Sequence, residues 1–170
     1  YRGKCVMVTG AGGSIGGELV RQLARLEPAC LVLYERHEHS LYLIEMELRR
    51  LHPDCPIVPV IGDILDGPRL SSLLRERHPS LLFHAAAYKH VPMMESNPQE
   101  AVKVNILGTK NVAQLALKHA VERFVFISSD KAVNPSNVMG ATKRVGELIL
   151  QDLVEEGRTR FMAVRFRNVL

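Results

Sequence analysis

Two short stretches of this sequence carry side chains that could move protons. Residues 128–131 read Ser-Ser-Asp-Lys directly after an apolar segment, and Met139 and Lys143 follow, four residues apart. Residues at that spacing share one face of a helix. An acid beside an amine, opposite a second lysine, offers the proton donors and acceptors that an elimination reaction requires. The spacing is equally compatible with a structural role, in which the serine and the aspartate cap a turn and the lysine points to solvent.

A glycine-rich loop follows the first apolar segment, at residues 9–17. Three of its glycines have the spacing G-x-x-G-x-x-G, in which bare backbone lets a pyrophosphate approach the N-terminus of the next helix. A turn that uses glycine only for its backbone angles is the alternative. An acidic residue at the end of the second apolar segment favours dinucleotide binding. The loop residues expected at the cofactor are Gly10, Gly13, Ser14, Ile15 and Gly16.

The acidic residue is Glu35, which can accept hydrogen bonds from both hydroxyls of an adenosine ribose and would repel a 2′-phosphate. The sequence therefore favours NAD over NADP. Arg36 could pair with a 2′-phosphate, although an arginine at this position is more often solvated. Asp63 and Ile64 follow the third apolar segment, where the aspartate either accepts from the adenine amino group or shapes a turn.

Small and amide side chains follow the fourth apolar segment. Ala85, Ala86 and Ala87 would let a ribose and a pyrophosphate lie close to the backbone, or would simply pack. Asn105 falls within a helix-type segment, where asparagine has a low propensity and needs polar partners when it is buried. We expect it to bridge to the neighbouring strand loop and to be one of the residues that bind the cofactor.

The elements that must position these residues alternate along the chain. Short, continuous apolar segments indicate strands covered on both faces, as in a parallel sheet, and they occur at 5–8, 30–34, 57–61, 81–84, 124–128 and 161–166. Helix-period segments separate them, at 15–26, 40–51, 68–77, 99–118 and 138–156. This α/β pattern predicts a Rossmann-type doubly wound sheet of order 3-2-1-4-5-6, with ligands at the carboxyl ends of its strands.

Composition excludes several classes of protein. The chain has 170 residues, of which 46% are apolar, enough for one domain over 1–170 and too many for intrinsic disorder. Its net charge of +4 comes from scattered cations, so no nucleic-acid-binding arm is expected. No apolar run approaches the roughly 18 residues of a membrane span, and the three cysteines lack the spacing of a zinc site. We expect no metal, a reducing cytoplasm, and a piece of a longer chain.

Five motifs together resemble one family. They are Thr-Gly-Ala-Gly-Gly-Ser-Ile-Gly at 9–16, His-Ala-Ala-Ala-Tyr-Lys-His-Val-Pro at 84–92, Asn-Pro at 97–98, Asn-Ile-Leu-Gly-Thr-Lys-Asn-Val at 105–112 and Ser-Ser-Asp-Lys-Ala-Val-Asn-Pro at 128–135. The chain resembles the bacterial nucleotide-sugar 4,6-dehydratases of polysaccharide biosynthesis, a branch of the extended short-chain dehydrogenase/reductases. Most members of that superfamily have Tyr-x-x-x-Lys where this chain has Met139 and Lys143, and methionine there resembles the large membrane-associated subgroup.

The resemblance implies roles for individual residues. Lys143 would hold the nicotinamide ribose, and Ser129 would lie near the 4-hydroxyl of the sugar. Asp130 would protonate the departing 6-hydroxyl, and Lys131 would remove the C5 proton, with Met139 beside them. Ser128 would lie at the cofactor, and Lys89 and Asn168 at the substrate. The implied reaction converts UDP-N-acetylglucosamine to its 4-keto-6-deoxy derivative by transient oxidation at C4.

The resemblance also bears on the whole protein. It implies a homo-oligomer, an inner-membrane anchor outside this stretch, and truncation before the C-terminal segment that grips the uridine diphosphate. Arg167 stands where family members have glycine. Two other functions remain open: a 4-epimerase, which would need the tyrosine that Met139 replaces, and a dinucleotide-sensing module without chemistry.

Overall fold

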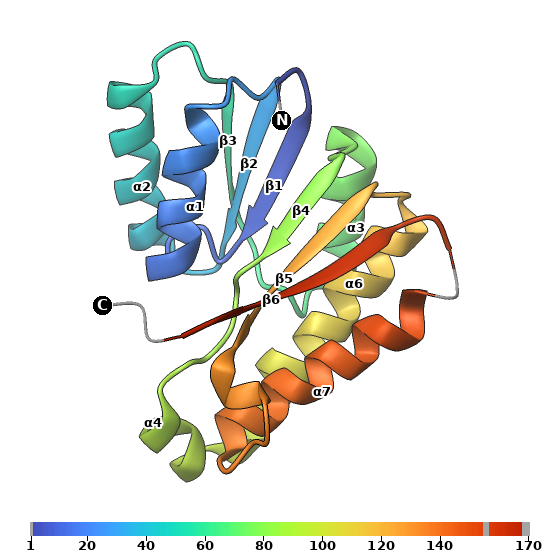
Figure 1. Cartoon of the computed structure of the whole chain (residues 1–170). Coiled ribbons are helices and arrows are strands. Elements are labelled where there is room, and N and C mark those ends of the chain that lie inside the picture. The colour runs from blue at the N-terminus through green and yellow to red at the C-terminus, as the bar shows by residue number, and fades with distance from the viewer. Residues whose placement is uncertain (1, 155–156, 168–170) are drawn as a thin grey trace.

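Six parallel strands form the centre of the computed structural model, which describes residues 2–154 and 157–167 (Figure 1). The sheet order β3-β2-β1-β4-β5-β6 confirms the predicted Rossmann-type topology. All five pairs of neighbouring strands run parallel. The strands are β1 (Cys5–Thr9), β2 (Cys30–Glu35), β3 (Ile57–Ile61), β4 (Leu81–His84), β5 (Arg123–Ser129) and β6 (Arg160–Phe166).

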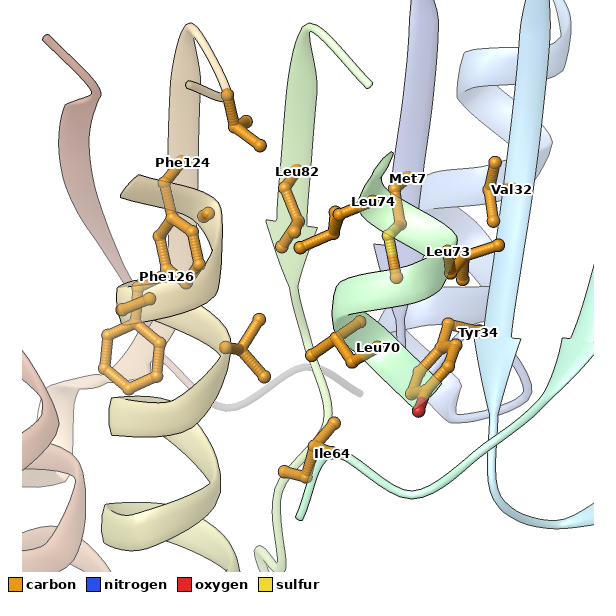
Figure 2. Packing of buried hydrophobic residues seen from close by; sticks show 14 of the residues in the cluster. Met7, Val32, Tyr34, Ile64, Leu70, Leu73, Leu74, Leu82, Phe124 and Phe126 are labelled. Atoms are coloured by element: carbon orange, nitrogen blue, oxygen red, sulfur yellow. The ribbon is translucent and has the colours of Figure 1, made fainter. Parts of the chain in front are cut away.

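Helices cover both faces of this sheet. On one face lie α1 (Ser14–Ala24) and α2 (Glu38–Leu51), and on the other α3 (Gly67–Arg77), α6 (Thr109–Lys118) and α7 (Val138–Leu153) (Figure 1). Successive residues of one strand therefore enter different cores. Met7 of β1 packs toward α3, as Figure 2 shows, whereas its neighbours Val6 and Val8 pack under α1 and α2. Burial on both faces explains why β1, β2 and β4 read as continuous apolar runs. The edge strand β6 was expected to be covered in the same way, but it is exposed or half-buried along its whole length.

The segment between β4 and β5 differs from its prediction. One helix was expected over 99–118, but the structure has α5 (Pro98–Ala101), a π-helix over Val102–Gly108 and then α6. Hydrophobic periodicity does not reveal a π-helix because the wider turn adds only about one residue to a helix. A further short helix, α4 (Val91–Ser96), was not predicted. Among the described residues, no helix combines the length and the apolarity needed to cross a bilayer.

Candidate active site

Two adjoining cavities lie along the carboxyl edge of the sheet. The glutamate cavity, of about 230 Å³, is bordered by the glycine loop, Glu35, Arg36 and Asp63. The lysine cavity, of about 780 Å³, is bordered by Lys89, Lys131, Lys143 and Arg167, among others. Both are lined by Gly13, Ala85, Ala87 and Tyr88, so the two cavities lie side by side, and together they are named the trough. The trough crosses the centre of the sheet, where strand order reverses and ligands of this fold bind.

The glycine loop presents bare backbone to this trough. Gly10 has a φ of +71°, and a Cβ there would lie 2.6 Å from the backbone nitrogen of Ala86, so only glycine fits between the β1 and β4 loops. Helix α1 begins at Ser14 after Gly13, which provides no side-chain cap. The first N–H groups of a helix lack partners within it and carry partial positive charge. Because Ser14, Ile15 and Gly16 line the lysine cavity, the site fits a pyrophosphate.

Glu35 holds the loop from the end of β2. Its two carboxylate oxygens accept the N–H groups of Gly12, at 3.1 Å, and His37, at 2.9 Å. A carboxylate has about four acceptor positions, so two of them can still accept ribose hydroxyls. Glu35 therefore fits the predicted ribose-binding position while it also fixes the loop.

Arg36 borders the glutamate cavity, and its side chain is exposed but has two partners. Its guanidinium donates to the Tyr88 hydroxyl at 2.7 Å, lies 5.6 Å from the centroid of that ring, and is 3.6 Å from the Asp63 carboxylate. The other oxygen of Asp63 accepts the N–H of Leu65 at 2.9 Å, which is the turn-forming role. Asp63 thus serves the turn and the cavity wall together, and Ile64 beside it lines the same cavity.

Asn105 forms the expected bridge to the loop after β4. Its side-chain oxygen accepts the N–H of Tyr88 at 2.8 Å, and its nitrogen donates to the Tyr88 carbonyl at 3.0 Å and to Thr142 at 3.0 Å. Asn105 was also predicted to bind the cofactor, but it borders neither cavity. It therefore positions the backbone around Tyr88, a residue that the sequence interpretation did not select although it is the only aromatic residue in an alanine-rich loop.

A buried histidine that was also not selected ties three elements together. The ring nitrogens of His84 make hydrogen bonds to the hydroxyls of Thr9, at 2.7 Å, and Thr109, at 3.0 Å. Its ring stacks on Phe126 with centroids 5.8 Å apart. Burial, with a smaller contribution from the charge of Lys143, lowers the pKa of His84 to about 3. The imidazole is neutral at physiological pH and acts as a polar link beneath the trough.

Lys143 and Met139 lie on one face of α7, as their spacing predicted, and both border the lysine cavity. The Lys143 amine donates to the Ile127 carbonyl at 2.8 Å and lies 4.7 Å from the centroid of the Phe126 ring. Burial lowers the pKa of Lys143 to about 8. Met139 is buried with Met94 and presents a thioether, which neither donates nor accepts a proton.

The end of β5 gathers a hydroxyl, a carboxylate and an amine. The Ser129 hydroxyl donates to Asp130 Oδ1 at 3.1 Å and accepts the N–H of Lys131 at 3.2 Å, and Lys131 Nζ lies 3.6 Å from Asp130 Oδ1. Partial burial raises the pKa of Asp130, but the Ser129 hydrogen bond and the Lys131 charge outweigh it and lower the pKa below its usual value. Ser129 and Lys131 line the lysine cavity and Asp130 does not, so the carboxylate meets the cavity through Ser129.

Close packing brings α7 against this turn. A Cβ at Gly140 would overlap the Lys131 carbonyl oxygen, so the first turn of α7 and the short 3₁₀ helix Asp130–Ala132 are in backbone contact. The contact holds Met139 and Lys143 opposite Lys131. The sequence left open whether Ser129 caps a turn or belongs to a reactive site. In the structure Ser129 caps the 3₁₀ helix and also lines the lysine cavity.

Ser128 points away from its neighbour. Its hydroxyl donates to the buried carboxylate of Glu147 at 2.7 Å, which also accepts two hydrogen bonds from Arg165 and one from Arg144. The Arg165 hydrogen bonds are the largest contribution that lowers the pKa of Glu147 to about 2. Ser128 borders the lysine cavity, but its hydroxyl joins β5 to α7 and β6. Glu147 was not selected from the sequence.

The two residues expected at the substrate have different outcomes. The Lys89 amine donates to the Ser14 hydroxyl at 3.1 Å and so lies at the N-terminus of α1. Asn168 lies outside the described residues. Among residues 2–154 and 157–167, no three His, Cys, Asp or Glu side chains are grouped so that they could hold a metal ion.

A family model described as polysaccharide biosynthesis protein matches residues 6–170. The chain belongs to this family. It is 51% identical over 169 residues to the capsular polysaccharide biosynthesis protein CapD of Staphylococcus aureus, a match that covers 98% of this chain and 28% of CapD. It is 33% identical over 174 residues to a UDP-N-acetylglucosamine 4,6-dehydratase (inverting) of Campylobacter jejuni, with 100% and 50% of the two chains covered.

A solved structure has a similar fold. The UDP-glucose-4-epimerase from Stenotrophomonas maltophila, with bound NAD and formylated UDP-arabinopyranose, superposes with a TM-score of 0.86 at 25% identity, and the match covers 95% of this chain and 52% of that one. The family resemblance inferred from the motifs is thus confirmed. The chain spans about a quarter to a half of the length of these relatives.

Proposed function

We propose that this domain binds NAD and that the whole protein uses it to convert UDP-N-acetylglucosamine to the 4-keto-6-deoxy sugar. The observation that carries the proposal is the cluster of Ser129, Asp130 and Lys131 at a cavity wall opposite Lys143 and Met139. Supporting it are the fit of the trough to a dinucleotide and the 33% identity to a named 4,6-dehydratase.

The residues of the trough fit an extended dinucleotide. Glu35 would bind the adenosine ribose, Arg36 and Asp63 would border the adenine, and the α1 N-terminus with Lys89 would bind the pyrophosphate. Lys143 would hold the nicotinamide ribose beside Met139. The chemistry that a bound NAD supplies is reversible hydride transfer: it accepts a hydride from C4 of the sugar at the start and donates it to C6 at the end.

The first step needs an acceptor for the 4-hydroxyl proton, and Met139 cannot serve. Ser129 can take this proton while it passes its own to Asp130 along their hydrogen bond. Because the pKa of Asp130 lies below its usual value, the group is an ionised carboxylate at neutral pH and has an oxygen that accepts the Ser129 hydrogen bond. The buried charge of Lys143 stabilises the negative charge that develops on the 4-oxygen.

The second step eliminates water. The Lys131 amine, after it gives up its own proton, removes the C5 proton, which the C4 ketone has made acidic. Asp130 then returns the proton that it received to Ser129, which passes the former 4-hydroxyl proton to the 6-oxygen, and the 6-hydroxyl leaves as water. Protonated Lys131 returns its proton to C5 as C6 is reduced. The water therefore contains the former 4-hydroxyl proton and the 6-hydroxyl group, and every residue ends in its starting state.

A 4-epimerase shares the first step but needs no acid for a leaving group at C6. Incubation of the full-length protein with NAD and UDP-N-acetylglucosamine, followed by mass spectrometry, distinguishes the possibilities. We expect a product that has lost one water, and no such product from the Lys131→Ala variant. An unchanged mass with altered stereochemistry at C4 would instead identify an epimerase, and an unaltered substrate would identify a dinucleotide-binding module.

A further inference from the structure

The wall of the lysine cavity is strongly cationic. Lys89, Lys131, Lys143 and Arg167 all line it, and no aspartate or glutamate is among the described residues that do. Cations gathered at a cavity without carboxylates favour anionic ligands. The pyrophosphate of one dinucleotide, bound at the N-terminus of α1, uses only one end of this wall.

Three of these cations already have partners within the chain. Lys89 donates to Ser14, Lys131 lies beside Asp130, and Lys143 donates to the Ile127 carbonyl. The remaining cation, Arg167, is exposed. An exposed guanidinium at a cavity wall can offer two parallel N–H groups to a phosphate.

Strand register places Arg167 beside the proposed reacting groups. Phe166, the last residue of β6, pairs with Ser129 in β5. Arg167 therefore comes one residue after the pair, level with Asp130 along the sheet edge. A nucleotide-sugar has its diphosphate on C1 of the sugar, so a sugar that presents C4 to C6 to Ser129 and Lys131 keeps its diphosphate within one ring of them.

We infer that Arg167 is a substrate-binding residue that contacts the diphosphate of the nucleotide-sugar. The inference rests on the proposed function, because it takes the ligand of the lysine cavity to be a nucleotide-sugar. Arg167 would provide charge-assisted hydrogen bonds from β6 itself, next to the reacting end of the substrate. The resemblance assigns no role to this position, since family members have glycine there.

The test measures binding of UDP to the full-length, NAD-loaded protein by titration calorimetry. We expect Arg167→Gly to raise the dissociation constant for UDP on the order of 10-fold or more, as loss of hydrogen bonds to a charged group does. Arg167→Lys should restore part of the affinity, and the affinity for NAD should not change. Arg160→Gly is the matched control, because Arg160 is an exposed arginine at the opposite end of the same strand.

The outcomes separate this inference from the proposed function. Unchanged UDP affinity in both Arg167 variants would overturn the inference even if the protein dehydrates its substrate. An effect on UDP-N-acetylglucosamine without an effect on UDP would also overturn it, because the contact would then be to the sugar. Loss of UDP affinity in Arg167→Gly with no dehydration by the wild type would support the subsite and overturn the proposed reaction.

Discussion

The hydroxyl of Ser129 donates to Asp130 Oδ1 at 3.1 Å, and only the serine of this pair borders the lysine cavity. The carboxylate is therefore separated from a cavity ligand by one hydroxyl. In the proposed reaction this hydroxyl is the route by which a proton leaves the substrate and is stored on Asp130.

Removing the hydroxyl should slow oxidation at C4, the step that begins the proposed reaction. We expect Ser129→Ala to lower turnover about 10²-fold or more, the usual contribution of a positioned proton-transfer group. Ser129→Thr keeps a hydroxyl and should retain much of the activity. Substrate deuterated at C4 provides the decisive measurement, because a larger isotope effect in Ser129→Ala would show that C4 oxidation has become rate-limiting.

Loss of the base and loss of the acid should block different atoms. In heavy water, substrate incubated with Lys131→Ala should gain almost no deuterium at C5. Supplied directly with the 4-ketosugar, which bypasses the oxidation that also uses Asp130, the Asp130→Asn variant keeps the base and should still exchange C5, while it expels the 6-hydroxyl on the order of 10² to 10⁴ times more slowly. Exchange at C5 in Lys131→Ala as fast as in the wild type would place the base elsewhere.

Met139 should act as a wall of the cavity and not as a chemical group. Met139→Leu keeps volume and apolarity, so we expect much of the activity to remain. Steady-state kinetics of this variant beside Lys131→Ala provide the comparison. Equal losses in the two variants would contradict a purely steric role for Met139.

Burial of Lys143 should make the free energy of unfolding depend on pH in the alkaline range. Its pKa falls from 10.5 to about 8 on folding, so between these values the unfolded chain binds more protons and the free energy of unfolding rises with pH. The stabilisation is absent below pH 8 and complete near pH 10.5. Relative to Lys143→Met, the wild type should gain on the order of 1 to 3 kcal/mol across this window by chemical denaturation. Lys110→Met, at an exposed lysine of α6, is the control.

Glu35 should make the protein prefer NAD to NADP. Its carboxylate would face a 2′-phosphate, and like charges in close contact cost several kcal/mol. We expect titration calorimetry to show a lower dissociation constant for NAD than for NADP. In Glu35→Gln the ratio of the two dissociation constants should fall about 10-fold or more. The reverse preference in the wild type would mean that Arg36 leaves Tyr88 and Asp63 to bind the phosphate.

The sequence predicted the sheet because each of its signals is local. Continuous apolar runs and the helix periods between them are properties of neighbouring residues, and the right-handed crossover leaves few sheet orders. The glycine loop and Glu35 were predictable for the same reason, since a strand, a loop and a helix N-terminus follow one another directly.

Side-chain partners could not be predicted in the same way. Ser128 and Ser129 are adjacent and chemically identical, yet one hydroxyl joins Glu147 and the other Asp130, because successive strand residues face opposite sides. The hydrogen bonds of His84 join residues that lie 75 and 25 positions away. Such contacts depend on the assembled sheet, which a sequence pattern does not describe.

The strand order also determines when the trough is completed during synthesis. The strands β1, β2 and β3 leave the ribosome before β4 and can pair with one another, but the second edge of β1 has no partner until β4 has emerged. An apolar strand with an open edge is a template for pairing with another chain. Gly10 gains its contact with Ala86 only at that moment. A nascent chain therefore passes through an interval in which it is prone to aggregate. During this interval the trough is incomplete, so a dinucleotide cannot bind there and stabilise the chain.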